Sequence, residues 1–327
     1  MTETMQALRL KSLDGPGALE LATVPAPAGG PNQVLVEVHA AGVGFPDLLM
    51  TRGQYQMRPA APFIPGIEVA GVVRRAPEGS PLKPGDRVAA NASLGGWAEV
   101  AVASPFVTFP IPDGMSFAQA TSMVNYQTAV FAFTERGGLK PGETVLIHGA
   151  AGGTGTAAIE VARGYGAKVI AVARGDDKLR TCRELGAEHG VEASGDWLAE
   201  VKRITGDKGV DVVYDPVGGD RFLDSIRAMG PGGRLLIIGF AAGTIPEVKV
   251  NRLLLRNTSL IGAAWGEWIR HDPMMPQRCA KEIDRLFAAG KINPIVGAEY
   301  PLAQGADALR EIEERRAIGK IVLKVRD

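Results

Sequence analysis

The sequence predicts an α/β protein that combines a β-rich substrate domain with a doubly wound parallel sheet. Three observations lead to this fold class. The first third of the chain holds short alternating runs of apolar and polar residues, the middle third alternates strands with helices, and a glycine-rich turn lies inside that middle third. A chain of 327 residues is long enough for two domains, each with its own core.

The first third is predicted to form an antiparallel sheet or barrel. Gly and Pro interrupt its apolar–polar runs at turns such as 84–86 and 112–114. The expected strands are 33–43, 67–76, 86–92 and 96–103. From Ser116 the pattern changes. Proline is absent, the serine suits a helix N-cap, and Gly137 and Gly138 end the segment, so we expect a helix there.

The middle third predicts a parallel sheet covered by helices on both faces, because near-continuous apolar strands alternate with amphipathic helices. The expected strands are 144–149, 168–173, 210–217, 233–240 and 258–264, and the helices between them include 153–165, 176–185 and 219–229. A helix near 276–290 and a strand near 319–325 follow, and we expect that strand to rejoin the first domain's sheet. The predicted domains are 1–123, completed by 267–327, and 124–266.

The bulk composition points to a small-molecule partner. Lys plus Arg and Asp plus Glu each total 36, so the net charge of zero offers no general attraction for nucleic acid or an anionic membrane. The longest apolar run contains glycines and is shorter than the ~20 residues of a membrane span. Cys182 and Cys279 belong to no paired motif, and the charged N-terminal segment does not resemble a signal peptide. We therefore expect reduced thiols and a cytoplasmic protein.

The stretch GAAGGTG, Gly149 to Gly155, lies between a predicted strand and a predicted helix. Against the G-x-G-x-x-G fingerprint of Rossmann dinucleotide-binding units, Ala150 takes the first glycine position, and Gly152 and Gly155 take the second and third. Gly152 would let the backbone approach a pyrophosphate, and Gly155 would let helix and strand pack closely. The strand–turn–helix context favours this interpretation over a merely flexible turn.

Arg174 indicates which dinucleotide is bound. It lies 19 residues after Gly155, near the place where a carboxylate usually reads the adenosine 2′-hydroxyl of NAD. Arginine cannot accept a hydrogen bond, but its guanidinium can hold a 2′-phosphate, and Lys178 on the next helix could face the same phosphate. The alternative is that both are solvated surface charges, and the neighbouring Asp176 and Asp177 weaken the phosphate interpretation. The charge pattern favours NADP(H) over NAD(H).

Several segments, in order along the chain, resemble the zinc-independent quinone oxidoreductases of the medium-chain dehydrogenase/reductase superfamily. They are AAGVGFPDLLMTRGQY, PFIPGIEVAGVV, GDRVAA, GGWAEV, NYQTA, HGAAGGTG, YDPVGG, GGRLLIIGFAAG and GKIVL. The resemblance covers essentially the whole chain. It implies a GroES-like substrate domain, a Rossmann cofactor domain, an active cleft between them and a homodimer.

The resemblance also implies a metal-free site. Alcohol dehydrogenases of the superfamily bind zinc through a cysteine and a Gly-His-Glu segment, whereas this chain has Ile67 in that segment and no cysteine between Gly44 and Asp47. Catalytic zinc requires three protein ligands. The four histidines are scattered at no ligand spacing: His39, His148, His189 and His271. Hydride addition to a quinone or an enone needs less activation than alcohol oxidation does, because the charge moves to a distant oxygen.

The family positions that contact the cofactor are carried over residue by residue. They are Thr128, Asp215, Val217, Phe240, Ala241 and Lys320. The glycine turn itself adds the loop residues Ala151, Gly152, Gly153, Thr154 and Gly155 to the expected cofactor site. The strand-end positions Val217 and Phe240 also fit the rule that open parallel sheets bind ligands at their carboxyl ends. For Thr128 and its neighbour Asn125 helix packing is an alternative role, and for Lys320 a surface charge.

The expected substrate pocket contains Gly44, Asp47, Tyr55, Trp265 and Trp268. Tyr55 matches the proton-donating tyrosine of related enoyl thioester reductases, and a packing role is an equal alternative. The two tryptophans could line an apolar pocket or belong to a dimer contact.

The chain departs from relatives at two positions. Gly44 stands where relatives commonly have an asparagine that faces nicotinamide or substrate. Ala193 stands where they often have a tyrosine against the 2′-phosphate, which slightly weakens the NADP(H) assignment.

Together these features predict an NADPH-dependent, metal-free reductase of quinones or α,β-unsaturated carbonyl compounds. One alternative is an enoyl thioester reductase, which would need a long pocket and a basic patch for the carrier phosphate. Another is an NADPH-binding protein with little turnover and a structural or regulatory role.

Overall fold

The computed structural model describes residues 3–326 and divides the chain into two compact units. One contains the chain up to residue 124 and again from 294, and the other is 125–293. Residues 1, 2 and 327, which the expected domain ranges include, lie outside the described residues. The expected return to the first domain at 267 is wrong. Helix α10 (Met275–Ala288) belongs to the second unit, where Arg278 pairs with Glu135.

The first unit is built on a seven-stranded sheet that contains all four strands expected there. Its order is β14 (Val296–Pro301), β15 (Lys320–Lys324), β3 (Val34–Val43), β4 (Glu68–Arg75), β5 (Arg87–Asn91) and β7 (Thr108–Pro110), and β6 (Val100–Ala103) also pairs with β3. Strands β1 (Thr4–Leu10) and β2 (Leu19–Pro25) form a separate antiparallel pair. Strand β6 is shorter than expected because the residues before it bridge to β1, through Ala98 and Ala7.

The C-terminal strand rejoins the first unit, as the sequence predicts. Strand β15 runs antiparallel to β3 and places Ile321 opposite Val43 and Leu323 opposite Ala41. All four side chains are buried in one core cluster that also holds Trp97. Burial of these apolar groups, each worth about 1.5–3 kcal/mol for a large side chain, anchors the end of the chain in the sheet.

The helix expected from Ser116 is divided into three parts. Ser116 caps α2 (Phe117–Ala120) through a capping box, because its side chain accepts from the Gln119 N–H at 3.1 Å and the Gln119 side chain accepts from the Ser116 N–H at 3.0 Å. The Thr121 hydroxyl then donates to the Ala118 carbonyl at 2.7 Å, a local bond that competes with helix continuation. Helix α3 (Met123–Phe131) follows and passes into a π-helical turn, Ala132–Arg136.

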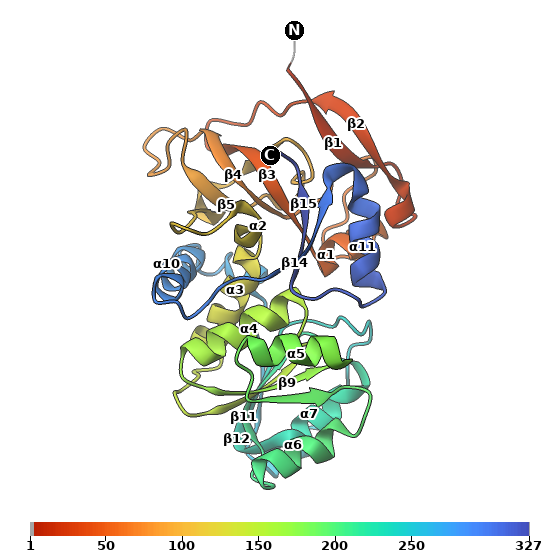
Figure 1. Cartoon of the computed structure of the whole chain (residues 1–327), viewed down its shortest axis with the longest axis vertical. Helices are drawn as coiled ribbons and strands as arrows, with labels where there is room; N and C mark the ends of the chain where they lie inside the picture. The colour runs from red at the N-terminus through yellow and green to blue at the C-terminus, as the bar shows by residue number, and fades with distance from the viewer. Residues whose placement is uncertain (1–2, 327) are drawn as a thin grey trace. The chain divides into compact units, whose positions relative to one another are not determined.

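The second unit is a six-stranded parallel sheet in the order β10, β9, β8, β11, β12, β13. The strands are β8 (Thr144–His148), β9 (Lys168–Ala173), β10 (His189–Glu192), β11 (Val210–Asp215), β12 (Met229–Ile237) and β13 (Ser259–Gly262). Helices α4 (Gly153–Gly164) and α5 (Asp176–Glu184) lie on one face, and α6 (Trp197–Thr205) and α7 (Phe222–Ala228) on the other (Figure 1). The fold is therefore the doubly wound parallel sheet that the sequence predicts.

Several short elements were not expected from the sequence. Strand β10 has four residues and includes a glycine, too short for a period to be recognised. The remaining helices are α1 (Phe45–Thr51), α8 (Asn251–Leu254), α9 (Trp265–Trp268) and α11 (Gly305–Glu313), with 3₁₀ turns at Pro16–Ala18, Pro105–Val107, Gly219–Arg221 and Leu302–Gln304. Within residues 3–326, no helix is both long enough and apolar enough to span a membrane.

Candidate functional site

The order of the parallel sheet brings most of the predicted cofactor residues to one edge. Strand order reverses between β8 and β11, and open α/β sheets bind ligands at the carboxyl ends of the strands beside such a reversal. The glycine loop follows β8 and Arg174 follows β9. The loops with Val217, Phe240 and Trp265 follow β11, β12 and β13. These segments, of which the first and last lie more than a hundred residues apart in sequence, share the carboxyl edge of the sheet.

Gly155 lets helix α4 begin directly against the end of β8. A Cβ atom at this position would lie 2.3 Å from the Gly149 carbonyl oxygen and 2.6 Å from the Ala150 Cα. Such contacts are prohibitive against backbone, so only glycine permits this packing.

Gly152 has a different environment. It is the N-cap of α4, and a Cβ there would meet only the Gly149 oxygen, at 3.5 Å. The outer side of the loop is thus open to an approaching group. The first-turn N–H groups, including those of Gly153 and Thr154, have no carbonyl four residues before them inside the helix. These donors and the positive end of the helix dipole fit a pyrophosphate.

Helix α3 supports this loop through Asn125. Its side-chain N–H donates to the Thr154 hydroxyl at 3.0 Å and so ties α3 to the first turn of α4. Thr128 lies three residues after Asn125, on the same helical face. Ala151 is buried and can contribute only its backbone to a ligand.

The end of β9 presents two cations. Arg174 is exposed, and within residues 3–326 its guanidinium forms no ion pair. Lys178 is half-buried in the first turn of α5, and its pKa lies below the usual value because of burial, to which the Arg174 charge adds. Asp177 pairs with Arg180 at 2.6 Å, so its charge is directed elsewhere. Two mutually repelling cations fit a dianionic 2′-phosphate.

Glu192 holds the turn behind these cations. Its carboxylate accepts from the Gly175 N–H at 2.8 Å and from the Ser194 N–H at 3.0 Å. The Gly175 bond is the main reason why the pKa of Glu192 falls to about 2. Gly175, with φ of 88°, is the N-cap of α5, so this carboxylate sets where that helix begins.

Asp215, for which a cofactor contact stays a prediction, is buried at the end of β11. It is 1% exposed, and one carboxylate oxygen accepts from the N–H groups of Val217 and Gly218 at 2.8 and 2.9 Å. These two donors draw the side chain into the turn, where burial raises its pKa. Asp215 thereby shapes the loop that carries Val217.

The loops after β11 and β12 are joined to each other. The N–H of Ala241 donates to the Pro216 carbonyl at 3.1 Å, and that of Ala242 donates to the Val217 carbonyl at 2.9 Å. Phe240 stays partly exposed beside them. Val217, Phe240 and Ala241 are thus held together at the carboxyl edge, where the sequence places them.

Lys320 lies inside the first unit. It is 3% exposed and forms a buried ion pair with Glu68. Gly42 makes the space: a Cβ there would lie 2.7 Å from Lys320 Cε and 2.9 Å from a Glu68 carboxylate oxygen. A lysine enclosed in this way is not a solvated surface charge, and its contact with the cofactor stays a prediction.

Asp47 belongs to the same buried group and does not line an open pocket. It is 2% exposed, and its carboxylate accepts from the Gly44 N–H at 2.8 Å, capping α1. Burial raises the pKa of Asp47 to about 7, and the nearby Glu68 charge adds to the effect, while Lys320 and the backbone N–H groups oppose it. The Asp47 carboxylate thus fixes the position of Gly44, the other residue expected in the substrate pocket.

Tyr55 follows α1 and is half-buried. It packs against an apolar cluster of Leu10, Met50 and Phe63, as does Ile67. The ring therefore has a packing role, and its partial exposure leaves part of the side chain accessible.

The described residues do not fit a metal centre. Between residues 3 and 326, no group of three or more His, Cys, Asp or Glu side chains is close enough to hold an ion. His148 is buried against Trp197 and pairs with the Ser225 hydroxyl at 2.9 Å, and burial lowers its pKa to about 3. His39 stacks on Phe117.

The tryptophans after β13 have different environments. Trp265 is 4% exposed, and its indole N–H finds no acceptor among the residues that the structure describes. Trp268 is half-buried and contacts Phe131, His271 and Arg136. No local pattern could have identified Arg136 as a contact of this segment, because the two lie more than a hundred residues apart.

Comparison with known proteins adds independent information. Residues 30–113 match the family model described as alcohol dehydrogenase GroES-like domain, and residues 153–284 match the one described as zinc-binding dehydrogenase. Quinone oxidoreductase-like protein 2 of Rattus norvegicus is 39% identical over 301 residues, which cover 91% of this chain and 86% of the relative. Quinone oxidoreductase of Rattus norvegicus is 32% identical over 326 residues, covering 98% and 97%.

Solved structures agree with these relatives. A probable oxidoreductase from Mycobacterium abscessus has a TM-score of 0.92 at 45% identity and covers 99% of this chain and 100% of its own. The quinone oxidoreductase from Thermus thermophilus, also solved in complex with NADPH, has a TM-score of 0.85 at 34% identity, covering 98% and 100%.

Replacing Asp47 with Asn should change how stability depends on pH. The folded-state pKa is raised, so the neutral carboxyl stabilises the fold fully below the unfolded value of 3.8, and this contribution is lost as pH rises toward about 7. Between pH 5 and pH 7 the wild-type free energy of unfolding should fall by about 2 kcal/mol relative to Asp47→Asn. Denaturant unfolding at both pH values measures the difference, and parallel pH profiles would contradict the assignment.

Proposed function

Because the chain belongs to the quinone oxidoreductase family of the medium-chain dehydrogenase/reductase superfamily, we propose that it is an NADPH-dependent, metal-free reductase of quinones or α,β-unsaturated carbonyl compounds. The chain is an oxidoreductase, and NADP(H) is its cofactor. The observation that carries the proposal is the pair of cations, Arg174 and Lys178, beside the open glycine loop. Two solved relatives are described as NADPH complexes, which supports it.

The chain's own residues fit each part of this cofactor. The α4 N-terminus and the Gly152 backbone bind the pyrophosphate, and Arg174 with Lys178 binds the 2′-phosphate. Val217, Phe240 and Ala241 then orient the nicotinamide half over the ends of β11 and β12. When bound, NADPH supplies the hydride; the protein orients its donor carbon and excludes water.

The absence of three suitable ligands supports metal-free chemistry. Ile67 has no lone pair to offer, and the described residues hold no cluster that could replace it. Without a Lewis acid, the better acceptors are those that spread charge through conjugation, as quinones and enones do.

Tyr55 is proposed as the proton donor. Hydride addition to an enal or an enoyl thioester leaves a carbanion or enolate that must take up a proton, and a phenol can deliver one. The matching tyrosine of enoyl thioester reductases makes that activity the second candidate. A low-turnover NADPH-binding role is the third candidate, and it requires only the nucleotide-binding residues.

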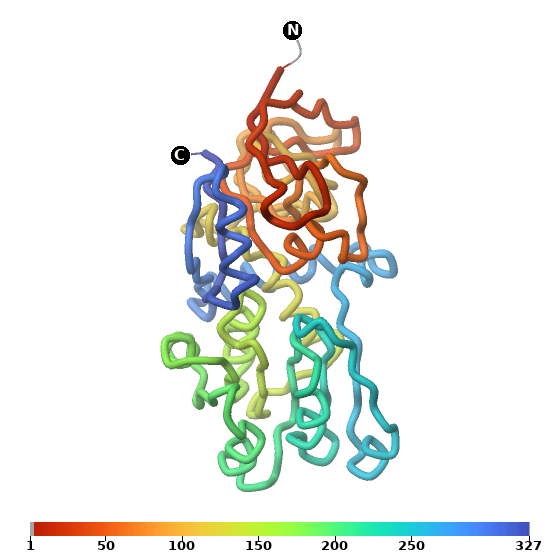
Figure 2. The backbone as a smooth tube through the Cα atoms, turned by 90° about the vertical axis from the view of Figure 1, so that its right-hand side faces the viewer, coloured from red at the N-terminus to blue at the C-terminus, as the bar shows by residue number. Residues whose placement is uncertain are grey.

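A homodimer is proposed from the edge of the second unit. Strand β13 is the last strand of its sheet, and the chain leading to it exposes large apolar side chains. Those at 75–79% exposure are Ile245, Val250, Leu254 and Leu255. Figure 2 shows this part of the chain along one edge of the second unit. An open strand beside apolar groups fits a second copy of the chain.

The two buried, unpaired cysteines are consistent with the cytoplasm.

Reversing the charge at Arg174 should reverse cofactor preference. Arg174→Glu removes charged hydrogen bonds to the 2′-phosphate and adds repulsion, so kcat/KM for NADPH should fall about 100-fold while that for NADH is unchanged or higher. Arg203→Glu makes the same charge change on α6, on the other face of the sheet from α5, and serves as the control. A wild-type preference for NADH, or equal losses in the two variants, would count against NADP(H) recognition by Arg174.

A panel of quinones, enals and enoyl-CoA esters tests the reaction. NADPH absorbance should fall with at least one class in the purified protein without added metal. If Tyr55 is the acid, Tyr55→Phe should reduce kcat on enals or enoyl thioesters about 100-fold and leave KM for NADPH unchanged. An unchanged kcat removes Tyr55 from this role. Tight NADPH binding without consumption by any acceptor would favour the binding-protein alternative.

Charged residues at the exposed apolar edge should separate the dimer. Leu254→Asp combined with Leu255→Asp buries two carboxylates at the proposed interface, so sedimentation velocity should change from dimer to monomer. Leu21→Asp changes a 48% exposed leucine in the first unit and should leave the dimer intact. A monomeric wild-type protein would contradict the proposal outright.

A further inference from the structure

Residues 263–274, the tryptophan segment, occupy one end of the carboxyl edge in the second unit. The segment follows β13, the strand farthest from β10 in the sheet order. If the adenosine phosphate is bound after β9, as the proposed function holds, the nicotinamide half extends over the ends of β11, β12 and β13. In the proposed function the tryptophan segment therefore adjoins the reacting end of the cofactor.

The π-helical turn Ala132–Arg136 contacts this segment through the Arg136 side chain. Gly137 follows the turn as its C-cap, and the Gly137 N–H donates to the Ala132 carbonyl at 2.8 Å, a bond across five residues. The Thr134 hydroxyl donates to the Val130 carbonyl at 2.7 Å. Such turns are rare and occur often at functional sites. Here the turn directs two consecutive side chains, Glu135 and Arg136, to the two ends of the tryptophan segment.

Arg136 holds the beginning of the segment. Its Nε donates to the Gly262 carbonyl at 2.9 Å, and its guanidinium carbon lies 4.7 Å from the centre of the Trp268 ring. Phe131 and His271 contact the same indole, with ring centres 5.8 and 4.9 Å away. One planar cation thus fixes both the backbone at the end of β13 and the ring of Trp268.

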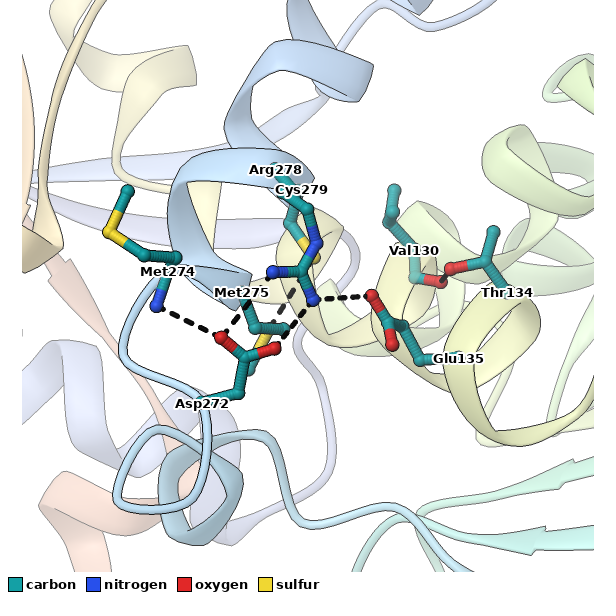
Figure 3. Close-up of polar contacts among 8 residues, drawn as sticks. All are labelled: Val130, Thr134, Glu135, Asp272, Met274, Met275, Arg278 and Cys279. Carbon is teal, nitrogen blue, oxygen red and sulfur yellow. Dashed lines mark hydrogen bonds and ion pairs between the residues drawn. The ribbon is translucent and has the colours of Figure 1, made fainter.

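Arg278 holds the end of the segment (Figure 3). Its Nη2 donates to an Asp272 carboxylate oxygen at 2.7 Å and to a Glu135 carboxylate oxygen at 2.8 Å. Asp272 also accepts from the Met274 N–H at 3.1 Å, just before α10. A single exposed ion pair contributes little, but one guanidinium that bridges two carboxylates from separate segments fixes their relative position.

We propose that the π-helical turn is a positioning element for acceptor selection. Arg136 directly and Glu135 through Arg278 hold the two ends of the tryptophan segment, and this sets the space for a planar aromatic acceptor beside Trp268. Glu135 and Arg136 are positioning residues, since they act through the segment. The inference rests on the proposed function for its link to the acceptor, whereas the contacts that hold the segment stand independently of it.

Acrylamide quenching of tryptophan fluorescence tests whether the segment is held. Trp97, Trp197 and Trp265 are all at most 7% exposed, so accessible emission comes mainly from half-buried Trp268, and Trp268→Phe identifies its share. Arg136→Gln should at least double the quenching constant of that share, and Arg136→Lys should restore it only in part because lysine lacks the planar fork. Arg270→Gln, which breaks only the local pair with Glu267, is the matched control and should change nothing.

Steady-state kinetics on the same variants test the link to the acceptor. Arg136→Gln and Glu135→Gln should raise KM for a two-ring quinone about tenfold more than KM for a one-ring quinone, with KM for NADPH unchanged. Unchanged quenching in both variants overturns the positioning role. Increased quenching with unchanged relative quinone KM values overturns the link to acceptor choice. A wild-type protein that reduces no acceptor overturns the proposed function and that link with it, while the quenching comparison still decides whether the turn holds the segment.

Discussion

The close approach of helix α4 to the end of β8 is the constraint on which the nucleotide site depends. It is possible only because position 155 has no side chain, since a Cβ there would overlap the Gly149 carbonyl and Ala150. The contact aims the first-turn N–H groups of α4 at the carboxyl edge of the sheet. Asn125 then ties α3 to the same turn. The position of the phosphate donors therefore follows from backbone packing rather than from any charged side chain.

Buried polar groups shape the loops in both units. Asp215 turns inward to accept two N–H groups, and Asp47 does the same at the start of α1. Lys320 is enclosed with Glu68 over Gly42. A buried charge needs a partner, and a nearby backbone donor or opposite charge satisfies that need better than an exposed ligand site could. Residues that match family contact positions can thus act by holding the backbone of their neighbours.

The carboxyl edge of the second unit combines two kinds of support. On the β9 side, Glu192 fixes the turn that carries Arg174 through neutral N–H donors. On the β13 side, guanidinium groups of Arg136 and Arg278 fix the tryptophan segment. Carboxylate–amide bonds set a local turn, whereas bridging guanidiniums join segments far apart in sequence. The two ends of a bound dinucleotide would meet surroundings of different rigidity and charge.

The sequence by itself determined the alternating strands and helices, the glycine loop, and the two cations that follow β9, because periodicity, glycine spacing and charge are local properties of the chain. Ionic partners more than a hundred residues apart have no local signature, so the pairs Arg278–Glu135 and Lys320–Glu68 came only from the tertiary structure. The same holds for the inward orientation of Asp47 and Asp215, since backbone donors that attract a side chain exist only once the turn has formed. Short-range pattern therefore predicted where residues lie along the edge of the sheet, and packing decided which way their side chains point.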